Sequence, residues 1–157
     1  MNTRLDTVGH RAIRIFHVVE SAAAAEAAGS RDGQICNGPF LPNSFAFNDN
    51  VKTITQNIEK AKELLKELGY DENNPFTFEV VTNTGHDTRI NTAQILQYQL
   101  EKAGVKMTIR VMEWQAFLNT VVHPKKFDAV ILGWSLGLMP DGYPLWHSSR
   151  DKLGGLN

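Results

Sequence analysis

The chain has 157 residues, of which 42% are hydrophobic and 21% are charged, and its formal net charge is −1. This length is sufficient for one domain with a substantial core. The balance of 16 basic against 17 acidic residues argues against a general nucleic-acid binder, which needs a basic face to displace counterions.

Residues 1–36 are the least informative part of the chain. An Ala-rich stretch with glycines behind it predicts a helix over about 12–28. Arg14 and His17 interrupt the apolar residues near the N-terminus, so no signal peptide is expected here, and no apolar run approaches the roughly 20 residues of a membrane span. We therefore expect 1–36 to be a separate segment, helical or partly disordered, ahead of a domain at 37–157.

The first strongly patterned part of the domain is a helix. Residues 37–50 before it are rich in Pro, Asn and Phe, which favours a loop that packs through its aromatic side chains. Asn57 can cap a helix that runs to Leu68, with apolar residues at helical spacing. Gly69 then suits the left-handed position that ends a helix.

A βαβαβ pattern follows. Strands are expected at 76–82, 105–112 and 127–134. The third is a nearly continuous apolar run, which predicts a central strand covered on both faces. Helices are expected from Asp87 or Thr88, either of which can cap, to about Ala103, and over 114–122. This order implies an α/β fold with a mainly parallel sheet.

Candidate ligand-binding residues follow the expected strand ends, because ligands of open α/β sheets bind beyond the carboxyl ends of the strands. These residues are Asn83, Thr84, Gly85, Trp114, Trp134, Ser135 and Asp141. The backbone N–H groups of the turn at 83–85 could hold a carboxylate or a carbonyl at the start of the next helix. An ordinary strand-to-helix turn is the alternative.

The side chains of this set also have two interpretations each. Trp114 and Trp134 could line a ligand cleft with their apolar faces, or they could pack in the core. Asp141 could bind an amine or sugar hydroxyls, or it could stabilise its turn. Arg89 could bind an anionic group, but we interpret it first as a solvated residue on a helix surface.

Catalysis, cofactors and metals are not expected. The five histidines show no spacing typical of metal ligands. Cys36 is the only cysteine, which excludes an internal disulfide and a CxxC motif. A thiol–imidazole pair of Cys36 with His147 can be drawn, but nothing in the sequence brings the two together.

Several runs together resemble the family-5 extracellular solute-binding proteins, the dipeptide, oligopeptide and nickel receptors of ABC importers. The runs are NGPFLPNSFAFN, NIEKAKELLKELGY, FTFEVVTNTG, AQILQYQLEKAGVKMTIRVMEW and FDAVILGWSLGLMPDGYPLWHSS, in family order over about 37–149. The resemblance implies a two-lobed receptor with a type II periplasmic-binding fold, of which 37–157 would be a truncated C-terminal lobe. It also implies a periplasmic or membrane-associated extracellular location and ABC permease subunits as partners.

The expected function is therefore reversible capture of a peptide or a related small solute, without chemistry. Peptide receptors of the family commonly carry an Asp three residues after the Trp of the GW motif, where it pairs with the peptide α-amino group. This chain has Gly137 there, so an oligosaccharide receptor lobe is one alternative. A truncated module that captures no ligand and self-associates through an exposed inter-lobe surface is another.

Overall fold

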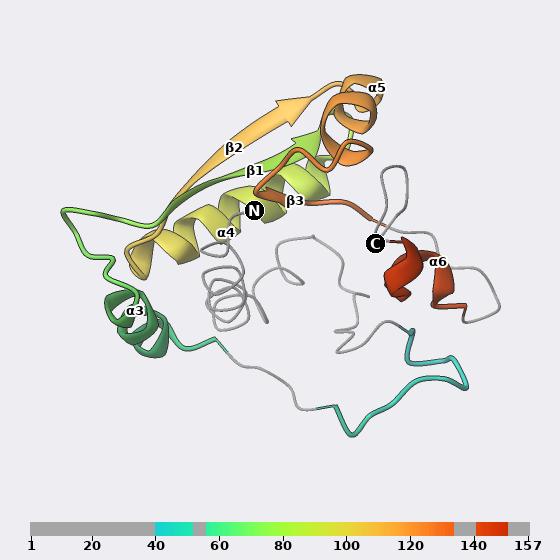
Figure 1. Ribbon diagram of the computed structural model, residues 1–157, viewed down its shortest axis with the longest axis horizontal. Helices are drawn as coiled ribbons and strands as arrows, with labels where there is room; N and C mark the ends of the chain where they lie inside the picture. Colours follow the sequence, from blue (N-terminus) through green and yellow to red (C-terminus); the bar gives the residue numbers. More distant parts are fainter. Residues whose placement is uncertain (1–39, 52–55, 134–140, 151–157) are drawn as a thin grey trace.

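The computed structural model describes residues 40–51, 56–133 and 141–150 (Figure 1). The elements are α3 (Ile58–Glu67), β1 (Thr77–Asn83), α4 (Asp87–Lys102), β2 (Lys106–Met112), α5 (Trp114–Phe117), the π-helical turn η1 (Leu118–Val122), β3 (Ala129–Val130), α6 (Tyr143–Trp146) and the 3₁₀ turn η2 (Ser148–Arg150). They form the expected α/β fold with a parallel sheet. The helix predicted over 12–28 lies outside the described residues.

The sheet has three strands in the order β2-β1-β3. β1 and β2 pair in parallel over their whole length, from Thr77 opposite Lys106 to Asn83 opposite Met112. This confirms the strands expected at 76–82 and 105–112. β1 is the central strand, and its residues from Val80 onward are buried.

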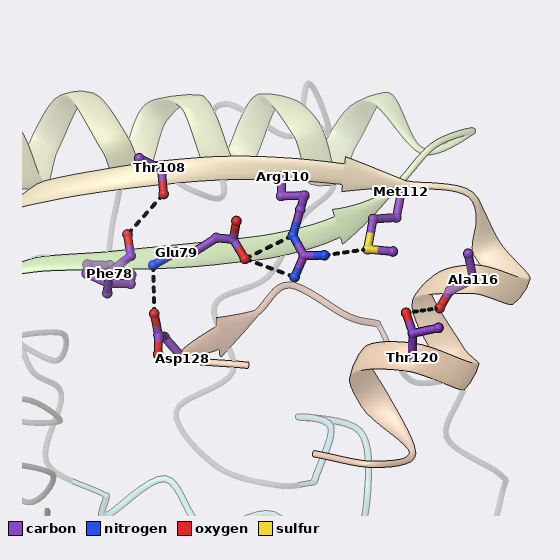
Figure 2. Close-up of polar contacts among 8 residues, drawn as sticks. All are labelled: Phe78, Glu79, Thr108, Arg110, Met112, Ala116, Thr120 and Asp128. Atoms are coloured by element: carbon purple, nitrogen blue, oxygen red, sulfur yellow. Dashed lines mark hydrogen bonds and ion pairs between the residues drawn. The ribbon is translucent and has the colours of Figure 1, made fainter. Parts of the chain in front are cut away.

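The prediction that 127–134 forms the central strand is wrong. β3 spans only Ala129–Val130 and lies at the edge of the described sheet, with both residues half-buried. The Asp128 carboxylate accepts the Glu79 backbone N–H at 3.0 Å (Figure 2). The Asp128 side chain thus binds the Glu79 N–H group, with which the backbone of a longer β3 would pair. Pairing between β1 and β3 therefore begins only at Val80.

The two faces of the sheet are covered differently. Figure 1 shows α4 lying along one face and α5 at the carboxyl ends of β1 and β2. The main core lies under α3 and α4; its buried members are Ala61, Leu65, Phe78, Val80, Ala93, Leu100, Ala103, Val105 and Met107. A second cluster on the other face joins Val81 to Phe117 and Val121 of α5 and η1. This second cluster packs α5 and η1, which follow β2, against the sheet.

The rest of that second face is polar. The Nε and NH2 atoms of Arg110 each lie 2.9 Å from Oε1 of Glu79, which joins β2 to β1 (Figure 2). The NH1 atom of Arg110 also lies 3.2 Å from the sulfur of Met112. About two fifths of each charged side chain is exposed, so water screens this ion pair.

The helix ends confirm one capping prediction and correct another. Oδ1 of Asn57 accepts the Lys60 N–H at 2.9 Å, and Gly69 adopts a φ of 84° after α3, as expected. The prediction that Asp87 or Thr88 caps α4 is wrong. His86 occupies the N-cap position without a side-chain bond, and Asp87 lies within the first turn. None of the described helices is long and apolar enough to cross a membrane.

The outer edge of β2 is partly occupied from α4. Nε2 of Gln97 donates to the Met107 carbonyl at 2.7 Å. Lys106 donates to Phe76 O beside β1, and neighbouring residues of a strand point their peptide groups to opposite sides. The Met107 carbonyl therefore faces away from β1, and the Gln97 amide ties α4 to the side of β2 opposite β1.

Candidate functional site

The carboxyl ends of β1 and β2 lie level with one another. Asn83 pairs with Met112, and the N–H of Thr84 donates to the Met112 carbonyl at 2.8 Å. Gly85 has a φ of 81°, a left-handed conformation that lets the chain turn into α4. The predicted set Asn83, Thr84 and Gly85 therefore forms one turn at the sheet edge where open α/β folds bind ligands.

Asn83 is buried, and its side chain bonds within the chain. It is only 2% exposed. Its Nδ2 donates to the Thr84 carbonyl at 2.7 Å, and its Oδ1 accepts a hydrogen bond from NH1 of Arg89. The amide therefore organises the turn and holds the first turn of α4 against the end of β1.

Arg89 is the functional candidate that the sequence interpretation undervalued. Its interpretation as a solvated surface residue is wrong, because the side chain is half-buried and lies among the ends of all three strands. Its guanidinium bonds to Asn83 and lies 5.9 Å from the ring centroid of Trp114. A Cβ placed on Gly133, after β3, would lie 3.2 Å from its NH2. The sequence does contain one signal for this residue. A cation in the first turn of a helix is unfavourable beside the positive end of the helix dipole, so an arginine there is unusual.

Trp114 begins α5, with one residue between it and the end of β2, and remains 37% exposed. Its ring packs against Phe117 with centroids 6.1 Å apart. The preceding Glu113 fixes this position, since its carboxylate accepts the Ala116 N–H at 3.0 Å and caps α5. Hydrogen bonds from the backbone of Gln115 and Ala116 lower the pKa of Glu113 below 4.5. The exposed part of the ring thus lies on a fixed element beside a guanidinium.

Asp141 is not joined to this cluster. Its exposed carboxylate accepts the Tyr143 N–H at 3.0 Å at the start of α6. Within the residues that the structure describes, it makes no hydrogen bond or ion pair with Asn83, Arg89 or Trp114. Trp134, Ser135 and Gly137 lie outside the described residues. The structure therefore brings together four of the seven predicted site residues and adds Arg89.

The described residues were compared with the metal, thiol–imidazole and ligand-binding sites considered for the sequence. Over the described ranges, no three His, Cys, Asp or Glu side chains lie close enough to hold a metal ion. Nδ1 of His147 lies 2.9 Å from Oγ of Ser149, and Cys36 is outside the described residues. The strand-end cluster offers a guanidinium, an indole face and a turn, which are groups that recognise an anion and apolar surface.

Comparison with known proteins places this geometry in a family context. The model for bacterial extracellular solute-binding proteins, family 5, middle region, matches residues 15–154. The oligopeptide-binding protein AppA of Bacillus subtilis is 33% identical over 136 residues, which cover 78% of this chain and 25% of that protein. The di/tripeptide-binding protein 4 of Pseudomonas aeruginosa is 35% identical over 101 residues, which cover 62% of this chain and 18% of that protein.

A solved structure agrees with these similarities. The oligopeptide-binding protein AppA from Bacillus subtilis, in complex with a nonapeptide, superposes with a TM-score of 0.82 at 29% identity. The match covers 93% of this chain and 32% of the other. The chain thus spans about a quarter to a third of the length of AppA.

Proposed function

Because the chain belongs to the bacterial extracellular solute-binding proteins of family 5, we propose that it forms part of the substrate-binding component of an ABC importer and captures peptides. The observation that carries this proposal is the family match over residues 15–154. The names of AppA and of the di/tripeptide-binding protein support a peptide as the solute. Trp114 and Arg89, at the ligand-binding edge of an α/β sheet, provide contacts for such a solute.

In this proposal the chain binds without catalysing a reaction and needs no cofactor. Residues 37–157 act as one lobe of the receptor, and 1–36 form a separate segment before it. Capture consists of closure of two lobes around the solute, followed by delivery to permease subunits outside the cytoplasm. A lobe alone offers part of the contact surface, so weak binding is expected of this chain.

An oligosaccharide is the second candidate solute. Gly137 stands where peptide receptors commonly carry the acid that pairs with an α-amino group. The partly exposed indole of Trp114 can stack on a sugar ring as well as on an apolar side chain. Self-association without a ligand is a third candidate, supported by exposed apolar side chains such as Phe45 and Trp146.

Ligand-observed saturation-transfer NMR tests these candidates, because it detects weak binding. The chain is mixed with a pool of di- to hexapeptides and, separately, with a pool of malto- and cello-oligosaccharides. Transfer to peptides that weakens in Trp114→Ala supports peptide capture at the strand ends. Transfer to sugars alone moves the assignment to an oligosaccharide receptor.

Trp146→Ala is the matched control, since it removes an exposed indole on α6 and should leave transfer unchanged. Absence of transfer from both pools, together with concentration-dependent association in sedimentation, would contradict solute capture and favour the self-association module.

A further inference from the structure

Trp114 is the first residue of α5, so the place of its ring depends on how this helix begins. The helix has four residues, and the π-helical turn η1 continues it. A helix this short makes few hydrogen bonds of its own, and the N–H groups of its first turn need acceptors from outside the helix. The start of α5 is therefore the point at which the indole can be held or released.

The end of α5 that follows Trp114 is held by burial. Phe117 is fully buried and Val121 is 2% exposed, and both belong to the second core cluster. Oγ1 of Thr120 donates to the Ala116 carbonyl at 2.7 Å, which joins η1 to α5 (Figure 2). The Phe117 ring also packs against the Trp114 ring. These contacts support the indole from the C-terminal side only.

The start of α5 is held by the side chain of Glu113. Its carboxylate accepts the Ala116 N–H at 3.0 Å, and its backbone carbonyl accepts the Phe117 N–H at 2.8 Å. Hydrogen bonds from the backbone of Gln115 and Ala116 lower the pKa of Glu113, so the cap is an ionised carboxylate at neutral pH. Among the described residues Glu113 forms no ion pair, so its carboxylate is used on the helix that carries Trp114.

This arrangement links the cap to the affinity for a solute. A solute that packs on the indole needs the ring in one position, and the apparent affinity falls with the fraction of molecules that have it there. Loss of the Glu113 carboxylate leaves the Ala116 N–H without its acceptor and lets the first turn of α5 open, while Phe117 stays buried. The ring would then lose its fixed position although the fold persists.

We infer that Glu113 is a positioning residue for solute binding, which acts by holding the indole of Trp114 in place at the carboxyl ends of the strands. The inference rests on the proposed function and adds to it a residue that acts on the solute through its neighbour. It distinguishes Glu113 from an ordinary helix cap, which contributes to stability alone.

Affinity for the pool of di- to hexapeptides, measured by titration with saturation-transfer NMR, tests this role. In Glu113→Ala the affinity should fall about fivefold, the effect of losing one helix cap. Glu113→Asp should restore most of it, because aspartate is among the preferred N-cap residues. Glu113→Gln keeps the length and an acceptor oxygen without the charge, and its affinity should fall about twofold.

Asn57→Ala is the matched control. Oδ1 of Asn57 caps α3 by accepting the Lys60 N–H at 2.9 Å, so this variant also loses one helix cap. Figure 1 shows α3 at the opposite end of the sheet from α5. Asn57→Ala should therefore lose stability and keep the wild-type affinity for the peptide pool.

The indole N–H resonance of Trp114 reports the position of the ring in the absence of peptide. Its assignment comes from comparison with Trp114→Phe. We expect the resonance to shift or broaden in Glu113→Ala and to keep its wild-type position in Glu113→Asp and Asn57→Ala. A wild-type indole resonance in Glu113→Ala would overturn the inference.

The affinities separate the inference from the proposed function. Wild-type affinity in Glu113→Ala, together with weakened binding in Trp114→Ala, would overturn the inference and leave peptide capture standing. Equal losses of affinity in Glu113→Ala and Asn57→Ala would also overturn it. If circular dichroism shows that Glu113→Ala does not fold, unchanged affinity in Glu113→Gln overturns it instead. Absence of binding by the wild-type chain would overturn peptide capture and the inference together.

Discussion

Arg89 and Asn83 are joined by a hydrogen bond from the guanidinium NH1 to the amide Oδ1, across the turn between β1 and α4. The same amide donates through Nδ2 to the Thr84 carbonyl. One buried side chain therefore shapes the turn and holds the arginine that follows it.

Replacing Asn83 with alanine should destabilise the chain by about 1–3 kcal/mol, because the amide itself is buried and both the Thr84 carbonyl and the half-buried Arg89 lose a hydrogen-bond partner. Urea unfolding followed by circular dichroism measures this loss. Asn74→Ala is the control: its exposed Nδ2 donates to Gly69 O at 3.3 Å, and its loss should cost less than about 0.5 kcal/mol. Equal effects of the two variants would contradict a structural role for the Asn83 amide.

Phe117 should be among the most sensitive positions of the fold. Its side chain is fully buried with Val81 and Val121 on the face opposite α4. Phe117→Ala should cost about 3–5 kcal/mol, since it removes apolar contact and leaves a cavity. Thermal unfolding measures the loss of stability. Phe45→Ala is the control, because it removes an aromatic side chain that is 86% exposed. A small loss of stability in Phe117→Ala would mean that the packing of α5 and η1 on this face of the sheet does not stabilise the fold.

Glu113 should make stability depend on acid pH. Hydrogen bonds from the Gln115 and Ala116 backbone lower its pKa below 4.5, so the folded state favours the carboxylate. The ionised Glu113 therefore stabilises the folded state fully at pH values above its pKa in the unfolded chain. This stabilisation is lost as the pH falls through the lower pKa that Glu113 has in the folded state. The melting temperature of the wild-type chain should therefore exceed that of Glu113→Gln at pH 7, and the difference should shrink below about pH 4.5. A difference that stays constant down to pH 3 would exclude this cap as its cause.

The ion pair of Glu79 with Arg110 should contribute little despite its short distances. Both side chains are about two fifths exposed, so solvent screens their attraction. A double-mutant cycle with Glu79→Gln and Arg110→Gln should give a coupling below about 1 kcal/mol, which decreases further as salt is raised. A larger coupling that is insensitive to salt would indicate that this face is shielded from water.

Local signals in the sequence located most elements of the fold. Asn57 and Gly69 bound α3 as expected because capping and left-handed backbone depend on the residue itself and its near neighbours. The alternation over 105–112 likewise identified β2. Helix ends and the alternation of a strand depend on a few neighbouring residues, so they can be predicted from the sequence.

Features that depend on distant contacts were not predictable in the same way. The apolar run at 127–134 has the composition of a central strand, but Asp128 takes the Glu79 N–H and β3 stays short at an edge. Arg89 has the sequence context of a surface residue, and only the approach of Asn83 and Trp114 shows that it lies at the strand ends. Trp134 and Ser135 remain predicted site residues.

The bond from Gln97 to the Met107 carbonyl has a consequence for how the chain behaves among its own copies. An exposed edge strand offers a row of donors and acceptors that a second strand can join, and uncontrolled joining leads to aggregation. At Met107 one acceptor of that row is already used by a side chain from α4. A Gln97→Ala variant would reopen it, so the glutamine protects the edge of the described sheet from strand addition as well as fastening a helix to it.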